Sequence, residues 1–276
     1  MKLPVALQLY SVRDFAEKDL ESTLTKVKDM GYDGVEFAGL YGHEPTQVKA
    51  MLDEIGLVPI SAHVPLDDML KDPDGVIGAY VDIGCQYIAV PYITEERRPG
   101  TDGFQETIKD IEKVAIAAKK LGIQMLYHNH DFEFVEVDGM YGLDIIFDSI
   151  SEDLLKTQID TCWVNVSGED PADYVRKYTG RAPIVHLKDF VMSGKEKPEG
   201  LYEFIGMESD KKENVEEENF GFRPIGYGVQ DFASILEASQ EAGAKWLVVE
   251  QDEPSLGKTS LECAGMSRDY LKEIGI

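Results

Sequence analysis

The sequence is poor in cysteine, in basic residues and in long apolar runs. Its 276 residues include 3 cysteines (Cys85, Cys162 and Cys263), whose scatter and odd number argue against a disulfide framework. No apolar run approaches the roughly 18 residues that a membrane-spanning helix requires. Lysine and arginine total 27 against 52 aspartates and glutamates, so the net charge is −25. That negative charge opposes binding to nucleic acid or to an anionic membrane surface.

Two further features are missing near the N-terminus. Residues 1–4 lead directly into an apolar stretch at residues 5–9 without a signal-peptide cleavage pattern, so we expect a cytoplasmic protein. The turn at residues 9–14, after the first apolar run, contains no glycine. An open doubly wound fold usually carries a glycine-rich phosphate turn there, so this fold is disfavoured.

What the sequence does contain is an alternation of short β-rich runs with longer helical segments. Strands are expected at residues 5–11, 34–38, 58–64, 86–93, 124–130, 155–160, 184–189 and 246–252. Most of these runs are apolar on both faces, as in a buried parallel sheet. Helices are expected at 20–30, 104–121, 231–242 and 261–274, and a glycine follows a helical segment five times before a strand (Gly31, Gly56, Gly84, Gly122 and Gly243). The sequence therefore predicts an α/β fold, a single-domain (β/α)8 barrel over residues 1–276.

One stretch, at about residues 191–224 after the seventh predicted strand, departs from this alternation. It contains Lys211-Lys212-Glu213 and Glu216-Glu217-Glu218 and shows no core periodicity. It is either a solvated surface insertion or a lid, because loops that follow barrel strands lie on the catalytic face. Both interpretations stay open.

Ionisable residues gather where the predicted strands end, which is the catalytic face of such a barrel. The histidines at these positions are His63, His128, His130 and His186, and the carboxylates at or just past them are Glu36, Glu133, Asp160, Asp189, Glu250 and Asp252. Burying so many ionisable groups without a partner costs several kcal/mol each, and a divalent cation is the simplest partner. Mixed imidazole and carboxylate ligands favour Mn²⁺, Zn²⁺, Co²⁺ or Fe²⁺ over Ca²⁺.

Each of these residues also has a purely structural interpretation. A histidine in a strand is often a hydrogen-bonded core residue, and Asp160 could cap the segment that follows it. Tyr10 and Trp163 suit core packing as well as stacking on a ligand. Lys188 and Arg223 are ordinary surface charges by default, although both lie beside proposed site elements.

Eight segments, spread from the first predicted strand to the last, resemble a known family. They are Gln8-Leu9-Tyr10-Ser11-Val12-Arg13, Gly34-Val35-Glu36, Ser61-Ala62-His63, Tyr127-His128-Asn129-His130-Asp131-Phe132-Glu133-Phe134, Asp160-Thr161-Cys162-Trp163, His186-Leu187-Lys188-Asp189, Pro224-Ile225-Gly226-Tyr227-Gly228 and Glu250-Gln251-Asp252. Together they resemble the sugar phosphate isomerase/epimerase family of xylose-isomerase-like TIM barrels, especially its inosose-dehydratase-like and hydroxypyruvate-isomerase-like branch. The resemblance covers essentially the whole chain.

The resemblance implies one divalent cation, Mn²⁺ before Zn²⁺, Co²⁺ or Fe²⁺, held by residues of the last four strands. Asp160, His186 and Glu250 match three of the family's ligands. Many relatives end strand 5 in Glu-Asn-His, where this chain has His128-Asn129-His130, so Glu133 is expected as the fourth ligand and His128 is the alternative. Trp163 stands where epimerases and the related apurinic endonucleases carry a histidine, which weakens a nuclease and a simple keto-sugar 3-epimerase interpretation.

The activity that the resemblance implies is isomerisation or epimerisation of a small sugar or keto-sugar through an enediolate. The absence of a glycine-rich phosphate cradle favours an unphosphorylated substrate, although both kinds stay open. The expected acid and base candidates are Glu133, Glu250, His128 and His130; His63, Lys188 and Arg223 are expected to hold substrate oxygens, and Trp163 and Tyr10 to face the sugar ring. Two alternatives stay open: a metal-dependent lyase acting on a keto-cyclitol or 3-keto-glycoside, and a non-catalytic sugar-binding barrel or partner subunit. A homodimer, or pairing with another subunit, is also expected.

Overall fold

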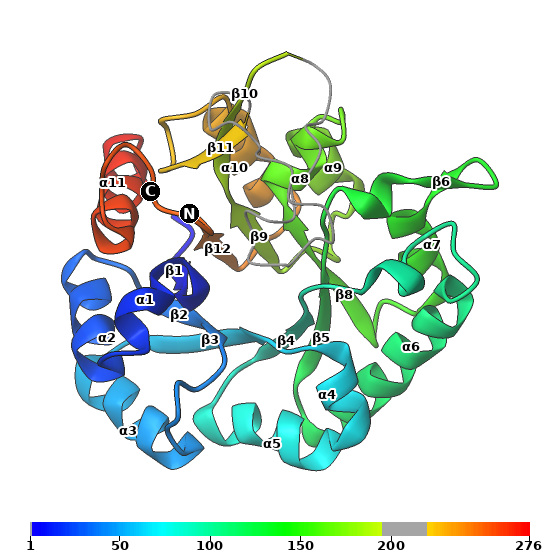
Figure 1. Cartoon of the computed structure of the whole chain (residues 1–276), viewed down its shortest axis with the longest axis horizontal. Coiled ribbons are helices and arrows are strands. Elements are labelled where there is room, and N and C mark those ends of the chain that lie inside the picture. The colour runs from blue at the N-terminus through cyan, green and yellow to red at the C-terminus, as the bar shows by residue number, and fades with distance from the viewer. Residues whose placement is uncertain (1, 195–219) are drawn as a thin grey trace.

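The computed structural model describes residues 2–194 and 220–276, which form a closed barrel (Figure 1). Its parallel strands follow one another around the ring in the order β1-β12-β9-β8-β5-β4-β3-β2. They are β1 (Val5–Gln8), β2 (Gly34–Ala38), β3 (Val58–His63), β4 (Tyr87–Val90), β5 (Gln124–His128), β8 (Leu155–Asp160), β9 (Ile184–Leu187) and β12 (Trp246–Val249). Ala6 of β1 is in register with Gly34 on one side and with Val248 on the other, which closes the ring. The predicted (β/α)8 barrel is confirmed.

Helices surround the strands on the outside of the barrel (Figure 1). They are α1 (Arg13–Ala16), α2 (Leu20–Asp29), α3 (Pro45–Ile55), α4 (Leu66–Lys71), α5 (Pro73–Ile83), α6 (Phe104–Leu121), α7 (Gly142–Ser149), α8 (Thr161–Val166), α9 (Pro171–Lys177), α10 (Phe232–Glu241) and α11 (Ser260–Glu273), with 3-10 turns η1 (Leu9–Val12), η2 (Glu95–Arg97) and η3 (Phe132–Phe134). The expected glycine caps are present: Gly56 ends α3 at φ 78° and Gly122 ends α6 at φ 84°, both left-handed. Within the described residues, none of the helices is long and apolar enough to cross a membrane.

Several strands end two or three residues earlier than the sequence predicts. β1 stops at Gln8, whose side-chain oxygen accepts a hydrogen bond from the backbone N–H of Tyr10 and so starts η1 instead of extending the strand. β12 likewise stops at Val249, although the N–H of Glu250 still donates to the carbonyl of Leu187. The polar residues of the predicted strand ends therefore occupy the rim of the barrel.

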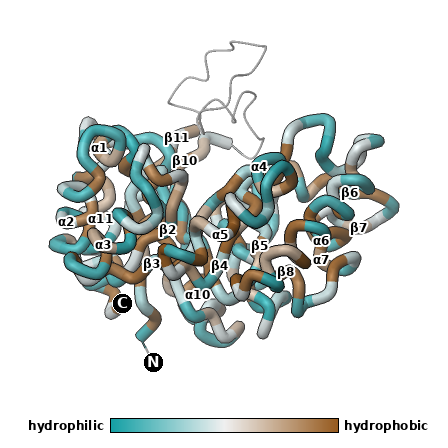
Figure 2. The backbone as a smooth tube through the Cα atoms, turned by 90° about the horizontal axis from the view of Figure 1, so that it is seen from below, coloured by the Kyte–Doolittle hydropathy of each residue, from teal (hydrophilic) through white to brown (hydrophobic). Residues whose placement is uncertain are grey.

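Two apolar layers support that rim. Hydrophobic colour follows much of the strands in Figure 2, whereas the outer helices show both colours. A small cluster of buried residues from six strands is separate from the large core that packs strands against helices; its members are Ala6, Ile60, Ala89, Leu126, Ile184 and Val248. These residues fill the inside of the barrel, because strand side chains alternate between its two faces. On β1, β5 and β9 the residue two positions farther along the strand faces the same interior.

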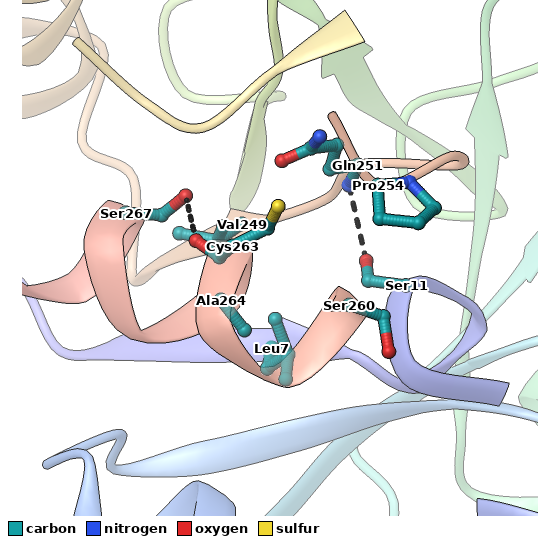
Figure 3. Close-up of a pocket in the computed structure, with 9 residues that line it drawn as sticks. All are labelled: Leu7, Ser11, Val249, Gln251, Pro254, Ser260, Cys263, Ala264 and Ser267. Carbon is teal, nitrogen blue, oxygen red and sulfur yellow. Dashed lines mark hydrogen bonds between the residues drawn. The ribbon is translucent and has the colours of Figure 1, made fainter. Parts of the chain in front are cut away.

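Helix α11 covers the seam between β1 and β12 (Figure 3). Cys263 and Ala264 of this helix line a cavity of about 10 Å³ together with Leu7 and Val249. Beside them the N–H of Gln251 donates to Ser11 Oγ over 3.0 Å. Such a space holds one water molecule at most. The cysteine is a packing residue, and all 3 cysteines are free and buried.

An antiparallel hairpin of β10 (Asp189–Met192) and β11 (Phe220–Arg223) lies at the two ends of the expected insertion. Residues 195–219 lie outside the described residues, so the choice between surface insertion and lid is not tested. Phe190 and Phe220 of the hairpin pack in one buried cluster with Trp163 of α8. Asp189 fixes the loop that follows β11, because its Oδ2 accepts the N–H groups of Gly226 and Gly228 at 2.9 and 2.8 Å.

Candidate metal and substrate site

The floor of the site consists of polar residues that follow the apolar filling of the barrel. His128 comes two residues after Leu126, and Glu250 two residues after Val248. His186 stands in the same relation to Ile184. Because alternate strand residues share a face, these side chains point into the interior directly beyond the apolar layer. At the end of each of these strands a polar residue thus follows an inward-facing apolar residue after one intervening position, which places imidazoles and carboxylates at the rim of the barrel.

Four buried side chains converge there. One ligand atom from each of His128, Asp160, His186 and Glu250 lies within 4.8 Å of the others. His186 Nδ1 is 3.2 Å from Glu250 Oε2, and His128 Nε2 is 3.7 Å from Asp160 Oδ2. Two imidazoles and two carboxylates form a donor set that suits Mn²⁺, Fe²⁺, Co²⁺ or Zn²⁺.

Asp160 shows that this group has room for a cation. Its Oδ1 caps α8 by accepting the N–H groups of Cys162 and Trp163 at 2.8 and 3.2 Å. Its Oδ2 is buried and accepts no hydrogen bond from the described part of the chain. A buried carboxylate oxygen without a donor is costly, and a bound cation would satisfy it. The residues present therefore fit a divalent metal.

The charges at the site are strongly coupled. Burial raises the pKa of Asp160 to about 6, although Lys188 opposes the shift. Burial also disfavours ionisation of Glu250, but Lys188 and His186 outweigh it and hold the pKa of Glu250 well below its usual range. His128 is neutral, because burial and the nearby His186 lower its pKa well below the ordinary value. A neutral imidazole is the form that can bind a metal.

Lys188 is the cation that the described residues place against this group. Its Nζ lies 2.6 Å from Asp252 Oδ2, 3.2 Å from Glu250 Oε2 and 3.7 Å from Asp160 Oδ2. Burial would lower the pKa of Lys188, but these carboxylates raise it well above the ordinary value, so the ammonium stays charged. It also lies 5.4 Å from the centre of the Trp163 ring. The buried ion pairs hold Lys188 in place at the side of the site.

A cavity of about 490 Å³ adjoins the four-residue group. It is lined by Tyr10, Ala38, Gly39, His63, Pro65, Pro91, Tyr92, His128, His130, Lys188, Glu250 and Asp252. Of the residues expected from sequence to act in catalysis or substrate binding, Tyr10, His63, His128, His130, Lys188 and Glu250 are on this wall. Asp252 and Tyr92 also lie on this wall. Both belong to the ends of predicted strands, but the sequence suggests no role for Asp252 and does not distinguish Tyr92 from its neighbours.

Three of the expected site residues lie elsewhere. Glu133 is buried outside the four-residue group, where it accepts from Tyr127 Oη at 2.6 Å and from the N–H of His130 at 2.8 Å. Trp163 is fully buried and forms the wall behind Lys188, so neither of its faces is open to a sugar. Arg223 lines a different cavity, beside the loop after β12, and donates to the carbonyl of Phe222.

Comparisons with known proteins agree with this architecture. The family described as "Xylose isomerase-like TIM barrel" matches residues 24–273. An inosose dehydratase from Geobacillus kaustophilus (strain HTA426) is 23% identical over 286 residues, covering 92% of this chain and 87% of that protein.

Two solved structures show the same fold. A sugar phosphate isomerase/epimerase from Parabacteroides distasonis ATCC 8503 superposes with a TM-score of 0.78 at 19% identity, covering 100% of this chain and 95% of the other. The IOLI protein, solved with a zinc atom, has a TM-score of 0.72 at 15% identity and covers 99% and 98% of the two chains. The family match spans nearly all of the chain, and the resemblance expected from sequence is confirmed. This chain belongs to the xylose isomerase-like TIM barrel family.

Proposed function

We propose that this protein is a divalent-metal-dependent isomerase or epimerase of a small keto-sugar. The observation that carries the proposal is the buried group of His128, Asp160, His186 and Glu250 beside a cavity of about 490 Å³. The orphan oxygen Oδ2 of Asp160 supports a cation in that group. The family's sugar-modifying members support the substrate class.

The proposed ligands are His128, Asp160, His186 and Glu250, so His128 replaces Glu133 as the fourth ligand. A divalent cation bound by them would polarise a substrate carbonyl, acidify the neighbouring C–H and stabilise the resulting enolate. Mn²⁺ is the first cation to test and Zn²⁺ the second, since a zinc atom is present in the structurally similar IOLI protein. Cobalt and iron suit the same donors.

The cavity wall supplies groups for proton transfer and for holding the substrate. His130 is neutral, because burial and the nearby Lys188 lower its pKa well below the ordinary value. A neutral imidazole on this wall can take the proton from the carbon next to the carbonyl and return it to a neighbouring atom. Lys188, kept charged by Asp252, donates to a substrate oxygen, and His63 and Tyr10 bind further hydroxyl groups.

A lyase is the second candidate, and two observations favour it. Several relatives that match over much of this chain are named inosose dehydratase. The cavity also carries two imidazoles, His128 and His130, whose ring centres lie 5.4 Å apart. If the β-carbon of the enolate bears a hydroxyl group, protonation of that hydroxyl expels water and leaves a conjugated enone. The same enolate thus leads to either reaction.

The test is to supply purified protein with Mn²⁺ or Zn²⁺ and to incubate it with keto-sugars and an inosose in D₂O. Exchange of the C–H next to the carbonyl, seen by NMR with conservation of mass apart from deuterium, supports isomerisation or epimerisation. Loss of water with growth of enone absorbance supports the lyase. Metal binding without exchange on any substrate overturns both enzymatic proposals in favour of a sugar-binding barrel.

Two variants make this test specific. Asp160→Asn removes the orphan carboxylate oxygen, and we expect it to abolish both metal binding and exchange while the fold is kept. Asp170→Asn is the matched control, because Asp170 is an exposed helix cap that accepts from the N–H of Asp173 on the outer helix α9. Full metal occupancy in Asp160→Asn would exclude this ligand set.

A further inference from the structure

Glu36 of β2 is a fully buried carboxylate beneath the proposed metal site, and both of its oxygens are saturated with donors. Oε1 accepts from Gln8 Nε2 at 2.7 Å, while Oε2 accepts from Gln158 Nε2 at 2.6 Å and from the hydroxyl of Ser61. These partners come from three other strands, β1, β8 and β3. So many donors around one carboxylate mark Glu36 as an acceptor held at the centre of the barrel.

Two histidines complete this shell. His186 Nε2 lies 2.8 Å from Glu36 Oε1, and His63 Nε2 lies 3.1 Å from the same oxygen. The two rings stack with an interplanar angle of 10° and centres 5.3 Å apart. His63 lines the substrate cavity, whereas His186 belongs to the four-residue group. One carboxylate therefore touches both the proposed metal ligand and the cavity wall.

The two nitrogens of His186 face different partners. Nε2 lies 2.8 Å from Glu36 Oε1 and Nδ1 lies 3.2 Å from Glu250 Oε2, so both nitrogens face carboxylates, which can only accept hydrogen bonds. A histidine that binds a metal must present a lone pair to it and keep its proton on the other nitrogen. A cation bound at Nδ1, beside Glu250, would require the ring proton on Nε2, and Glu36 Oε1 is the acceptor 2.8 Å from that nitrogen.

Gln158 sets the proton of His63 by the same logic. Its amide nitrogen donates to Glu36, so its oxygen is the atom that faces His63 Nε2 at 2.7 Å. An amide oxygen can only accept, so Nε2 of His63 carries the proton. The remaining acceptor of the ring is Nδ1, and His63 can receive a hydrogen bond from a substrate hydroxyl there.

We propose that Glu36 is a positioning residue that fixes the Nε2-protonated tautomer of His186 and, through Gln158, that of His63. The role rests on the proposed function, because it gives His186 a metal to bind. Glu36 itself is neither a ligand nor a proton-transfer group. Loss of a carboxylate that holds a metal-binding histidine typically weakens metal binding by roughly 10- to 100-fold. We expect a loss of about this size here.

The test is the substitution Glu36→Gln, which keeps the shape and removes the acceptor pair. If the NH₂ group of the new amide takes the place of Oε1, it faces His186 Nε2, which then lacks its acceptor. If it takes the place of Oε2, it faces the amide nitrogen of Gln158, whose side chain then has to turn. We expect Zn²⁺ to bind roughly 10- to 100-fold more weakly, with unchanged 1:1 stoichiometry, by competition with a chromophoric chelator. An unchanged Kd overturns the proposal.

Ser61→Ala is the matched control, since it removes one donor from the same shell and leaves the carboxylate in place. We expect its Zn²⁺ affinity to stay within about threefold of the wild type. Asp160→Asn separates this proposal from the proposed function. If Asp160→Asn loses the metal while Glu36→Gln binds Zn²⁺ with the wild-type affinity, the positioning role alone is refuted. If both variants bind Zn²⁺ with the wild-type affinity, the metal site itself is refuted.

A measurement on the wild-type protein covers the case in which Glu36→Gln fails to fold. The chain has 5 histidines, so ¹⁵N-histidine labelling gives few signals, and His43→Gln and similar variants assign them. In the Zn²⁺-loaded protein we expect His186 to carry its proton on Nε2 and to bind zinc through Nδ1. We expect His63 to be protonated at Nε2 as well. A proton on Nδ1 of either ring contradicts the inference.

Discussion

The burial of Glu133 makes the stability of this protein depend on pH in a way that one substitution can isolate. Burial raises the pKa of Glu133 from 4.5 to about 7, although hydrogen bonds from Tyr127 and the N–H of His130 oppose the shift. The folded state therefore binds the proton more tightly than the unfolded chain. The stabilisation is complete below the unfolded pKa of about 4.5, falls as the pH rises, and is lost once the pH passes about 7.

The size of the effect follows from those two pKa values. A difference from 4.5 to about 7, at about 1.4 kcal/mol per pH unit, gives about 3 kcal/mol. In Glu133→Gln this dependence is absent, because the amide stays neutral at every pH. Other buried acids, such as Asp252, titrate alike in both proteins, and their contribution cancels in the difference between variant and wild type.

The assay is unfolding in denaturant at pH 5 and pH 8. Between these values we expect the wild type to lose about 2–3 kcal/mol of unfolding free energy relative to Glu133→Gln, because pH 5 already lies slightly above the unfolded pKa. Glu54→Gln, an exposed change of the same chemistry on α3, serves as control and should follow the wild type. Parallel pH profiles for wild type and Glu133→Gln would refute the reasoning.

Three other substitutions probe the site and its walls. His128→Gln should weaken metal binding at least about 100-fold, whereas Glu133→Gln should leave the Kd within about threefold of the wild type. The reverse result would identify Glu133 as the ligand in place of His128. Trp163→Ala should lower the unfolding free energy by about 3–5 kcal/mol, because the ring is fully buried, and a loss below 1 kcal/mol would show that the site relaxes. Gly228→Ala should cost about 1–3 kcal/mol in the same assay, since a Cβ there would lie 2.2 Å from Asp189 Oδ1; an unchanged stability would mean that the loop can shift.

The fold can be predicted from the sequence because the features that determine it lie close together along the chain. Each buried strand is a short apolar run, and residues such as Gly56 and Gly122 end helices where the chain turns back. Part of the candidate site can be predicted for the same reason. Asp160, His186 and Glu250 stand at strand ends, and the parallel barrel brings those ends together.

The contacts of Glu36 could not be read in this way. The sequence marks it as a carboxylate at a strand end, but its partners lie on other strands, with Gln158 122 positions away. Which of several buried carboxylates becomes a ligand and which becomes an anchor depends on those distant partners. The burial of Trp163 has the same origin, since Phe220 and Phe222, which cover it, belong to a hairpin more than fifty residues farther along.

The fourth ligand expected from the sequence, Glu133, differs from the proposed one, His128, by five residues. A family pattern with glutamate at the end of strand 5 favours the nearest glutamate, which is Glu133. The strand ends at His128, however, and the following turn η3 carries Glu133 to Tyr127 and to the N–H of His130. A carboxylate with both oxygens engaged gains little by leaving these donors, whereas His128 already faces Asp160 across 3.7 Å. The strand alternation that places His128 inside the barrel is the reason that we propose it as the ligand, whereas Glu133 bonds within the turn that follows His130.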